Sequence, residues 1–169
     1  MKNLNSEESV VGKLFCIPAV VLFFVLLWYF TRPIIVIETE GKILFSAPAE
    51  SGTQFSTRFI HSVQKTPVEE FFIVNDDCDG FILKSTRYQS FGVGLPFLES
   101  DGNFRLEGDY FIMDNLNRSI KTLDLRPGVG TELSINVNDQ ILPIYKIVPL
   151  GSLVRVSIIP RYKYLNYSF

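Results

Sequence analysis

Residues 54–74 of this chain, QFSTRFIHSVQKTPVEEFFIV, decide the fold class. In residues 54–61, Phe55, Thr57, Phe59 and His61 alternate with their neighbours, and a period of two is typical of a half-buried strand. Residues 68–74 carry apolar side chains on both faces, which predicts a central strand. A short polar turn joins the two runs, so this stretch predicts a pair of neighbouring strands.

The rest of the chain after residue 33 repeats this kind of pattern. Short apolar runs alternate with turn residues, and no long stretch shows a helical period. Pro143 would place its strand at an edge or a bulge. We therefore predict an all-β fold of about ten strands, an antiparallel β-sandwich or barrel-like domain over residues 34–160. The further predicted strands are 34–38, 42–46, 80–88, 110–114, 119–125, 133–137, 141–147 and 154–158, with 91–103 the longest irregular stretch.

One transmembrane helix is expected before this domain. Residues 14–30, LFCIPAVVLFFVLLWYF, contain no charge and would span roughly 25 Å as a helix. Trp28 and Tyr29 lie at one end, where aromatic side chains favour the membrane interface. A cleaved signal peptide usually has a shorter apolar run and a small-x-small cleavage site, which is absent here. We therefore expect a permanent anchor.

The anchor divides the chain into four parts. Residues 1–13 would be a cytoplasmic tail, 14–30 the transmembrane helix, 34–160 an extracytoplasmic β domain and 161–169 a C-terminal tail. Basic residues flank the helix almost equally on both sides, so the orientation rests on the short N-terminal tail and the long polar domain that follows. The C-terminal tail is basic and aromatic, and could be a frayed end or could contact anionic lipid headgroups.

Composition excludes several classes of function. The formal net charge is −2, without the clustered basic face that nucleic-acid binding needs. Cys16 lies in the anchor and Cys78 far beyond it, so no disulfide is expected. The single histidine has no metal-ligand spacing around it, and there is no nucleophile motif. We expect no metal, no cofactor and no enzymatic activity.

The polar residues around the turn at 61–67 are the main candidates for a site. Alternation would place His61 on the same face as Phe59, and a buried histidine needs a hydrogen-bond partner. Glu69 or Glu70 could supply it, and only one of these two neighbours can share the core face. Two interpretations stay open. The pair pins a hairpin, or His61, Lys65, Glu70 and Arg87 form a polar pocket for a small anion or a partner's side chain.

Two short stretches carry a family resemblance. Residues 61–70, HSVQKTPVEE, and 86–96, TRYQSFGVGLP, resemble a bacterial family known as domain of unknown function eighteen-fifty, and the likeness covers roughly residues 45–159. Val93 stands where the family usually has alanine, so this loop is expected to be slightly wider. The positions that the family motif marks for testing are His61, Pro67, Glu69, Glu70, Gln89, Gly92 and Gly94.

The resemblance implies a setting rather than a reaction. Such proteins are similar to small domains anchored in the bacterial cytoplasmic membrane, often encoded beside TAXI-type TRAP transporters. It implies an accessory or interaction module that contacts the transporter's permease or solute receptor outside the membrane. The alternative is an extracytoplasmic domain that binds or senses a small anion through His61, Glu70 and Arg87.

Overall fold

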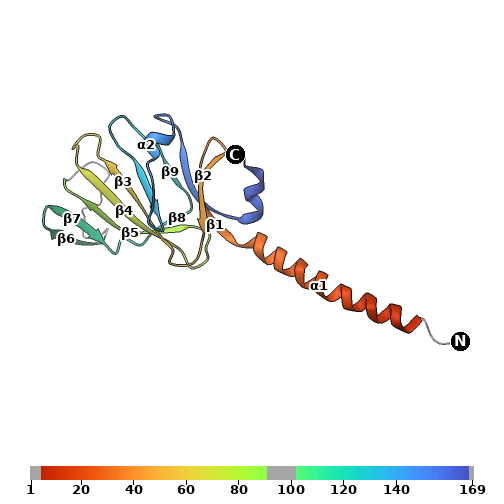
Figure 1. Cartoon of the computed structure of the whole chain (residues 1–169). Coiled ribbons are helices and arrows are strands. Elements are labelled where there is room, and N and C mark those ends of the chain that lie inside the picture. The colour runs from red at the N-terminus through yellow and green to blue at the C-terminus, as the bar shows by residue number, and fades with distance from the viewer. Residues whose placement is uncertain (1–4, 91–101, 168–169) are drawn as a thin grey trace.

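A long N-terminal helix projects from a β-rich domain in the computed structural model of the chain (Figure 1). The structure describes residues 5–90 and 102–167, with side chains described from residue 17 onward. Helix α1 covers Asn5–Thr31 and leads directly into the first strand. Within the part of the chain whose side chains are described, no helix combines the length and the hydropathy of a membrane span.

The domain consists of two antiparallel sheets. A 4-stranded sheet has the order β2-β1-β12-β9, and an 8-stranded sheet has the order β11-β10-β3-β4-β5-β7-β6, with β8 paired to β5. The smaller sheet contains β1 (Pro33–Thr39), β2 (Lys42–Pro48), β9 (Leu123–Leu125) and β12 (Val154–Pro160). The larger sheet contains β3 (Gln54–Ile60), β4 (Pro67–Val74), β5 (Phe81–Tyr88), β6 (Asn103–Glu107), β7 (Tyr110–Asp114), β8 (Arg118–Ile120), β10 (Ser134–Val137) and β11 (Gln140–Leu142).

The predicted all-β class is confirmed, and because the two sheets share one hydrophobic core, the fold is the sandwich rather than the barrel-like alternative. Ile35 and Ile37 of β1 belong to the same buried cluster as Phe55 and Phe72 of the larger sheet. The ring of Phe55 stacks on Phe72 with centroids 4.7 Å apart and meets the edge of Phe81 at 4.8 Å. Aromatic residues are favoured on such a pleated, half-buried surface because each buries a large apolar area.

Antiparallel pairing aligns residues across the centre of the larger sheet. Strand β4 lies between β3 and β5, which confirms its predicted central position. The register pairs Phe55 with Phe72 and Thr57 with Glu70. Because side chains alternate between faces, these four side chains point toward the core, and their chain neighbours point away from it.

Two predicted strands differ from the structure. Residues 141–147 do not form one strand, because Pro143 cannot donate to the ladder. Strand β11 ends at Leu142, and Ile144–Ile147 form the short helix α2. Residues 119–125 also divide, and β8 pairs with β5 while β9 pairs with β12 in the other sheet.

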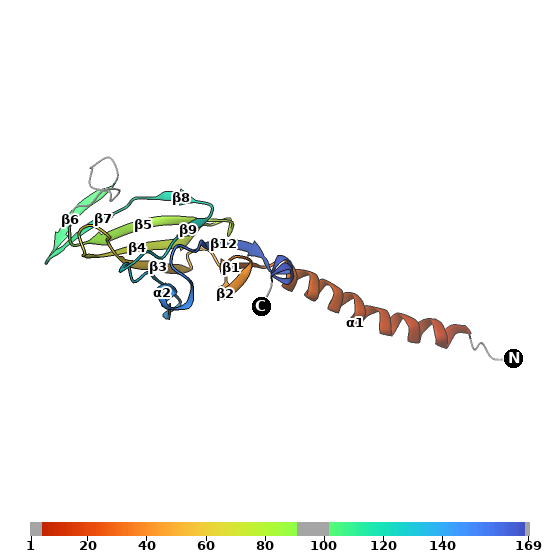
Figure 2. The same ribbon diagram turned by 90° about the horizontal axis from the view of Figure 1, so that it is seen from above.

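Two further elements were not predicted. Strand β6 begins at the last residue of the stretch expected to be irregular, and pairs with β7. In the C-terminal tail, Arg161–Asn166 form the 3-10 helix η1. Both views place η1 beside the domain end of α1 (Figures 1 and 2).

Candidate functional site on the outer face of the larger sheet

The sequence-predicted residues separate onto the two faces of the larger sheet. Glu69 pairs with Arg58 on β3 and with Arg87 on β5, whereas Glu70 pairs with Thr57 and Thr86. Successive residues of a strand point to opposite faces, so Glu69 and Arg87 lie on the outer face and Glu70 faces the core. The prediction that only one of the two glutamates shares the core face is confirmed.

An ion-pair row crosses the outer face. Glu69 forms ion pairs with Arg58 at 3.4 Å and with Arg87 at 3.7 Å, each distance measured from a guanidinium nitrogen to a carboxylate oxygen. The Arg87 guanidinium also lies 3.7 Å from the ring centroid of Tyr110. Its Nε is buried and has no hydrogen-bond partner in the described part of the chain. The row therefore carries two cations for one carboxylate, and one donor of Arg87 is left unused.

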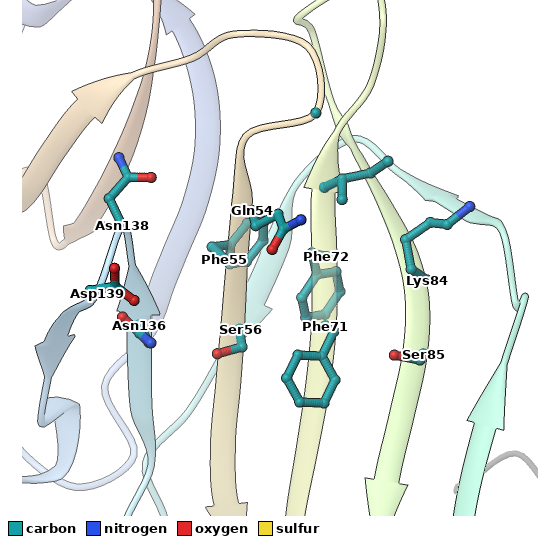
Figure 3. Close-up of a pocket in the computed structure, with 12 residues that line it drawn as sticks. Gln54, Phe55, Ser56, Phe71, Phe72, Lys84, Ser85, Asn136, Asn138 and Asp139 are labelled. Atoms are coloured by element: carbon teal, nitrogen blue, oxygen red, sulfur yellow. The ribbon is translucent and has the colours of Figure 1, made fainter.

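A groove lies beside this row on the same face. It has a volume of about 800 Å³. Phe71 lies between Ser56 of β3 and Ser85 of β5 (Figure 3). The Phe71 side chain is 39% exposed. The groove is lined by Gly52, Gln54, Phe55, Ser56, Phe71, Phe72, Ile73, Lys84, Ser85, Asn136, Asn138 and Asp139.

The groove frames an exposed aromatic ring with polar groups. Asn136 faces Ser56 across the β10–β3 ladder, and its buried Oδ1 has no hydrogen-bond partner among the described residues. Buried polar atoms are normally paired, so this unpaired acceptor is an exception in the wall of the groove. An apolar centre surrounded by hydrogen-bonding groups is the usual composition of a recognition site.

Glu70 has a structural environment on the core face. Its carboxylate accepts a hydrogen bond from the buried Thr57 hydroxyl at 3.0 Å. Burial raises the pKa of Glu70, and the Thr57 hydrogen bond opposes that shift. The neighbouring Thr86 hydroxyl is buried and has no partner among the residues described. Because Glu70 and Arg87 occupy opposite faces, the expected pocket of His61, Glu70 and Arg87 is not formed.

His61 closes the turn between β3 and β4 through backbone contacts. The strand ends at Ile60, so the alternation that predicted an inward His61 stops one residue earlier. The His61 Nδ1 accepts hydrogen bonds from the backbone N–H groups of Val63 and Gln64 at 3.3 and 3.2 Å. The expected His61–Glu pair was therefore wrong, although the histidine does hold the hairpin.

The other candidates lie around this turn. Lys65 is exposed with a φ of +55°, and its N–H donates to the His61 carbonyl. Gln89 directly follows the end of β5. The next residue, Ser90, donates to the Gln64 side chain at 3.3 Å. Gly92 and Gly94 lie outside the described residues.

Sequence reasoning missed the residues that build the groove. The sequence pattern predicts that Phe71 belongs to a strand apolar on both faces, and none of its neighbours in the sequence marks it as exposed. Ser56 and Arg58 alternate with core residues, which identifies an outer face but not what lies beside it. No group of three or more potential metal ligands occurs in the described ranges.

The fold and the outer face together define an all-β, sandwich-like domain with a groove on the outer face of its larger sheet. A protein-family model described as Domain of unknown function (DUF1850) matches residues 55–144, more than half of the chain. The chain therefore belongs to this family, as the resemblance of its two motifs indicated. No curated protein matches the chain, and no solved structure matches it.

Proposed function

We propose that this protein is a single-pass, membrane-anchored interaction module, and that the groove around Phe71 is where it binds its partner. The observation that carries the proposal is the exposed Phe71 ring, which lies in a groove of about 800 Å³ among polar side chains. Exposed aromatic residues with a polar surround are typical of the residues that dominate binding energy at interfaces.

The anchor is supported by the surface of α1. Large apolar side chains from Ile17 to Tyr29 are 46–65% exposed, all around the helix. A helix that is apolar on every side has no stable place in water and is suited to a lipid environment. We propose that α1 crosses the bacterial cytoplasmic membrane and that the β domain lies on its extracytoplasmic side.

The partner is proposed from the family resemblance. We propose a component of a TAXI-type TRAP transporter, either the permease or the solute receptor, which makes this chain an accessory subunit. The groove lies within the residues matched by the family model, apart from Gly52 and Gln54 at its edge. A partner segment that inserts an apolar side chain against Phe71 could also form hydrogen bonds with polar side chains that line the groove.

Affinity purification of the full chain from native membranes tests this function. The wild-type chain should recover a transporter component. With Phe71→Ala, the amount recovered should fall at least tenfold, because an interface hot spot contributes about 2 kcal/mol or more. Phe104→Ala is the matched control, since Phe104 is 43% exposed on β6 and lies outside the groove. Equal recovery with Phe71→Ala, or no transporter component with the wild type, would contradict the proposal.

A second function is favoured by the ion-pair row. Arg58 and Arg87 carry one positive charge more than Glu69 neutralises, and their side chains are 53% and 40% exposed, so their guanidinium groups could bind a small carboxylate anion. Titration calorimetry of the full chain with succinate tests this. Binding should weaken in Arg87→Gln and persist in Arg126→Gln, a control whose guanidinium donates to the Gly151 carbonyl instead. Heat changes that are the same in both variants would exclude the row as an anion site.

A further inference from the structure

The junction between α1 and η1 forms a surface that the groove on the larger sheet does not include. The register pairs Pro33 with Pro160, so β1 begins where β12 ends and η1 is brought against the end of α1. The Arg161 N–H donates to the Arg32 carbonyl at 2.9 Å, which joins the two segments directly. We call this surface the collar, comprising Trp28, Tyr29, Arg32, Arg161, Lys163 and Leu165.

Two arginines of the collar lie over aromatic rings. The Arg32 guanidinium carbon lies 4.1 Å from the centroid of Trp28, and that of Arg161 lies 4.0 Å from the centroid of Tyr29. A guanidinium that lies over an aromatic ring is attracted by the ring's π face and still has N–H groups that can donate to an anion. Neither arginine forms an ion pair within the described part of the chain. These donors are therefore free to receive an anion.

An apolar groove adjoins these cations. It has a volume of about 520 Å³ and is lined mainly by Tyr29, Phe30, Ile34, Ala47, Pro48 and Leu165. No acidic side chain lines it, and Arg161 forms part of its wall. Leu165 is 73% exposed although it is apolar. The chemistry that fits is an amphipathic ligand with an anionic head and an apolar tail, and the volume is within the usual range for ligand sites.

We infer that the collar binds an anionic phospholipid of the membrane in which α1 is anchored. The apolar run ends at Phe30, so Arg32 and Arg161 would lie at the depth of the headgroups, with Trp28 and Tyr29 in the aromatic belt. The phosphate is bound by the stacked arginines, and the upper acyl chain lies in the groove beside Leu165. This site would hold the domain close to the bilayer. The inference rests on the proposed anchor and lies outside the residues matched by the family model.

Site-directed spin labelling of the full chain in nanodiscs tests the collar. In a Cys16→Ala, Cys78→Ala background, a nitroxide is attached at Leu165→Cys or, as a control, at Val129→Cys. Val129 is exposed and lies two residues after Pro127. The Pro127 carbonyl accepts a hydrogen bond from the Gly151 N–H, which precedes the start of β12, whereas the collar adjoins the end of β12 at Pro160. Val129 is therefore far from the collar. Discs contain phosphatidylcholine alone or an equimolar mixture with phosphatidylglycerol, and collisions with oxygen and with a water-soluble nickel complex are measured.

The label at residue 165 should be shielded from nickel in mixed discs and less so in phosphatidylcholine discs, while residue 129 stays accessible in both. Replacing Arg161 and Lys163 by glutamine should lower the ratio of shielded to nickel-accessible label by about fivefold for each residue replaced. Lys42→Gln with Lys146→Gln removes the same charge elsewhere and should change nothing. Equal shielding in both discs, or an effect of the control pair, would overturn the inference.

Trp28 separates failure of the collar from failure of the anchor. It is the single tryptophan of the chain, so its quenching by brominated lipid reports on α1 alone. Quenched Trp28 with a nickel-accessible label at residue 165 overturns the collar and leaves the anchor intact. Unquenched Trp28 overturns the anchor and, with it, the collar.

Discussion

Replacing two adjacent phenylalanines should have opposite consequences for stability and binding. Phe72 is 2% exposed, and its ring stacks on Phe55 in the shared core. Truncating a buried phenylalanine to alanine costs about 3–5 kcal/mol, because apolar contacts are lost and a cavity remains. The stacked geometry places Phe72→Ala toward the upper half of that range, at about 4 kcal/mol.

Phe71 should behave differently because it points into the outer groove. Complete burial of a phenylalanine stabilises by up to about 3 kcal/mol, and Phe71 remains 39% exposed. Its removal leaves an opening that water fills rather than a closed cavity. We expect Phe71→Ala to lower the free energy of unfolding by about 1–2 kcal/mol, while it abolishes recovery of the partner.

Urea unfolding of the full chain in a non-ionic detergent measures the difference. Near-ultraviolet circular dichroism follows the tertiary packing of the β domain, and the slope with urea should be unchanged in both variants. A loss in Phe71→Ala as large as that in Phe72→Ala would refute the assignment of Phe71 to the outer face. Full partner recovery by a folded Phe71→Ala would refute its role in binding.

Three further predictions concern Glu70, Glu69 and Gly102. The raised pKa of Glu70 means that the folded chain keeps a proton that the unfolded chain has lost, so stability falls as the pH rises from the pKa of the unfolded state through that of the folded state. Glu70→Gln should flatten this decline. In urea titrations, its gain in stability over the wild type should be larger at pH 7 than at pH 4. Glu69→Gln should cost only about 1 kcal/mol, because both ion pairs are partly exposed, and the loss should shrink in high salt; a salt-independent loss would contradict this account. Gly102→Ala should destabilise by about 1–3 kcal/mol in thermal melts, because its Cβ would collide with the Asp114 carbonyl oxygen, and an unchanged melting temperature would contradict the close approach.

Local pattern was sufficient for much of the fold. The period of two in residues 54–60 identified β3 and its core face, and the same rule assigned the two glutamates to opposite faces. Local pattern failed where the chain changed direction. The pattern of residues 119–125 predicts one strand, yet β8 and β9 join different sheets.

Only part of the candidate site could be predicted from the sequence. Glu69 and Arg87 were named in advance, but with His61 and Glu70 as companions. Periodicity describes which face a residue occupies and says nothing about where a strand stops, so the end of β3 at Ile60 removed His61 from the predicted face. The groove needed β10 beside β3, a pairing of residues about eighty positions apart along the chain, as Asn136 and Ser56 show.

The sequence by itself determined the all-β class, the long apolar segment before it and the family, because each depends on residues that are neighbours in the chain or on short motifs. Only the tertiary structure decided which side chains share a surface. The groove around Phe71, the ion-pair row across three strands and the collar at Arg32 and Arg161 all join distant segments. Their proximity follows from the packing of two sheets on one core, a balance of long-range contacts that no local pattern records.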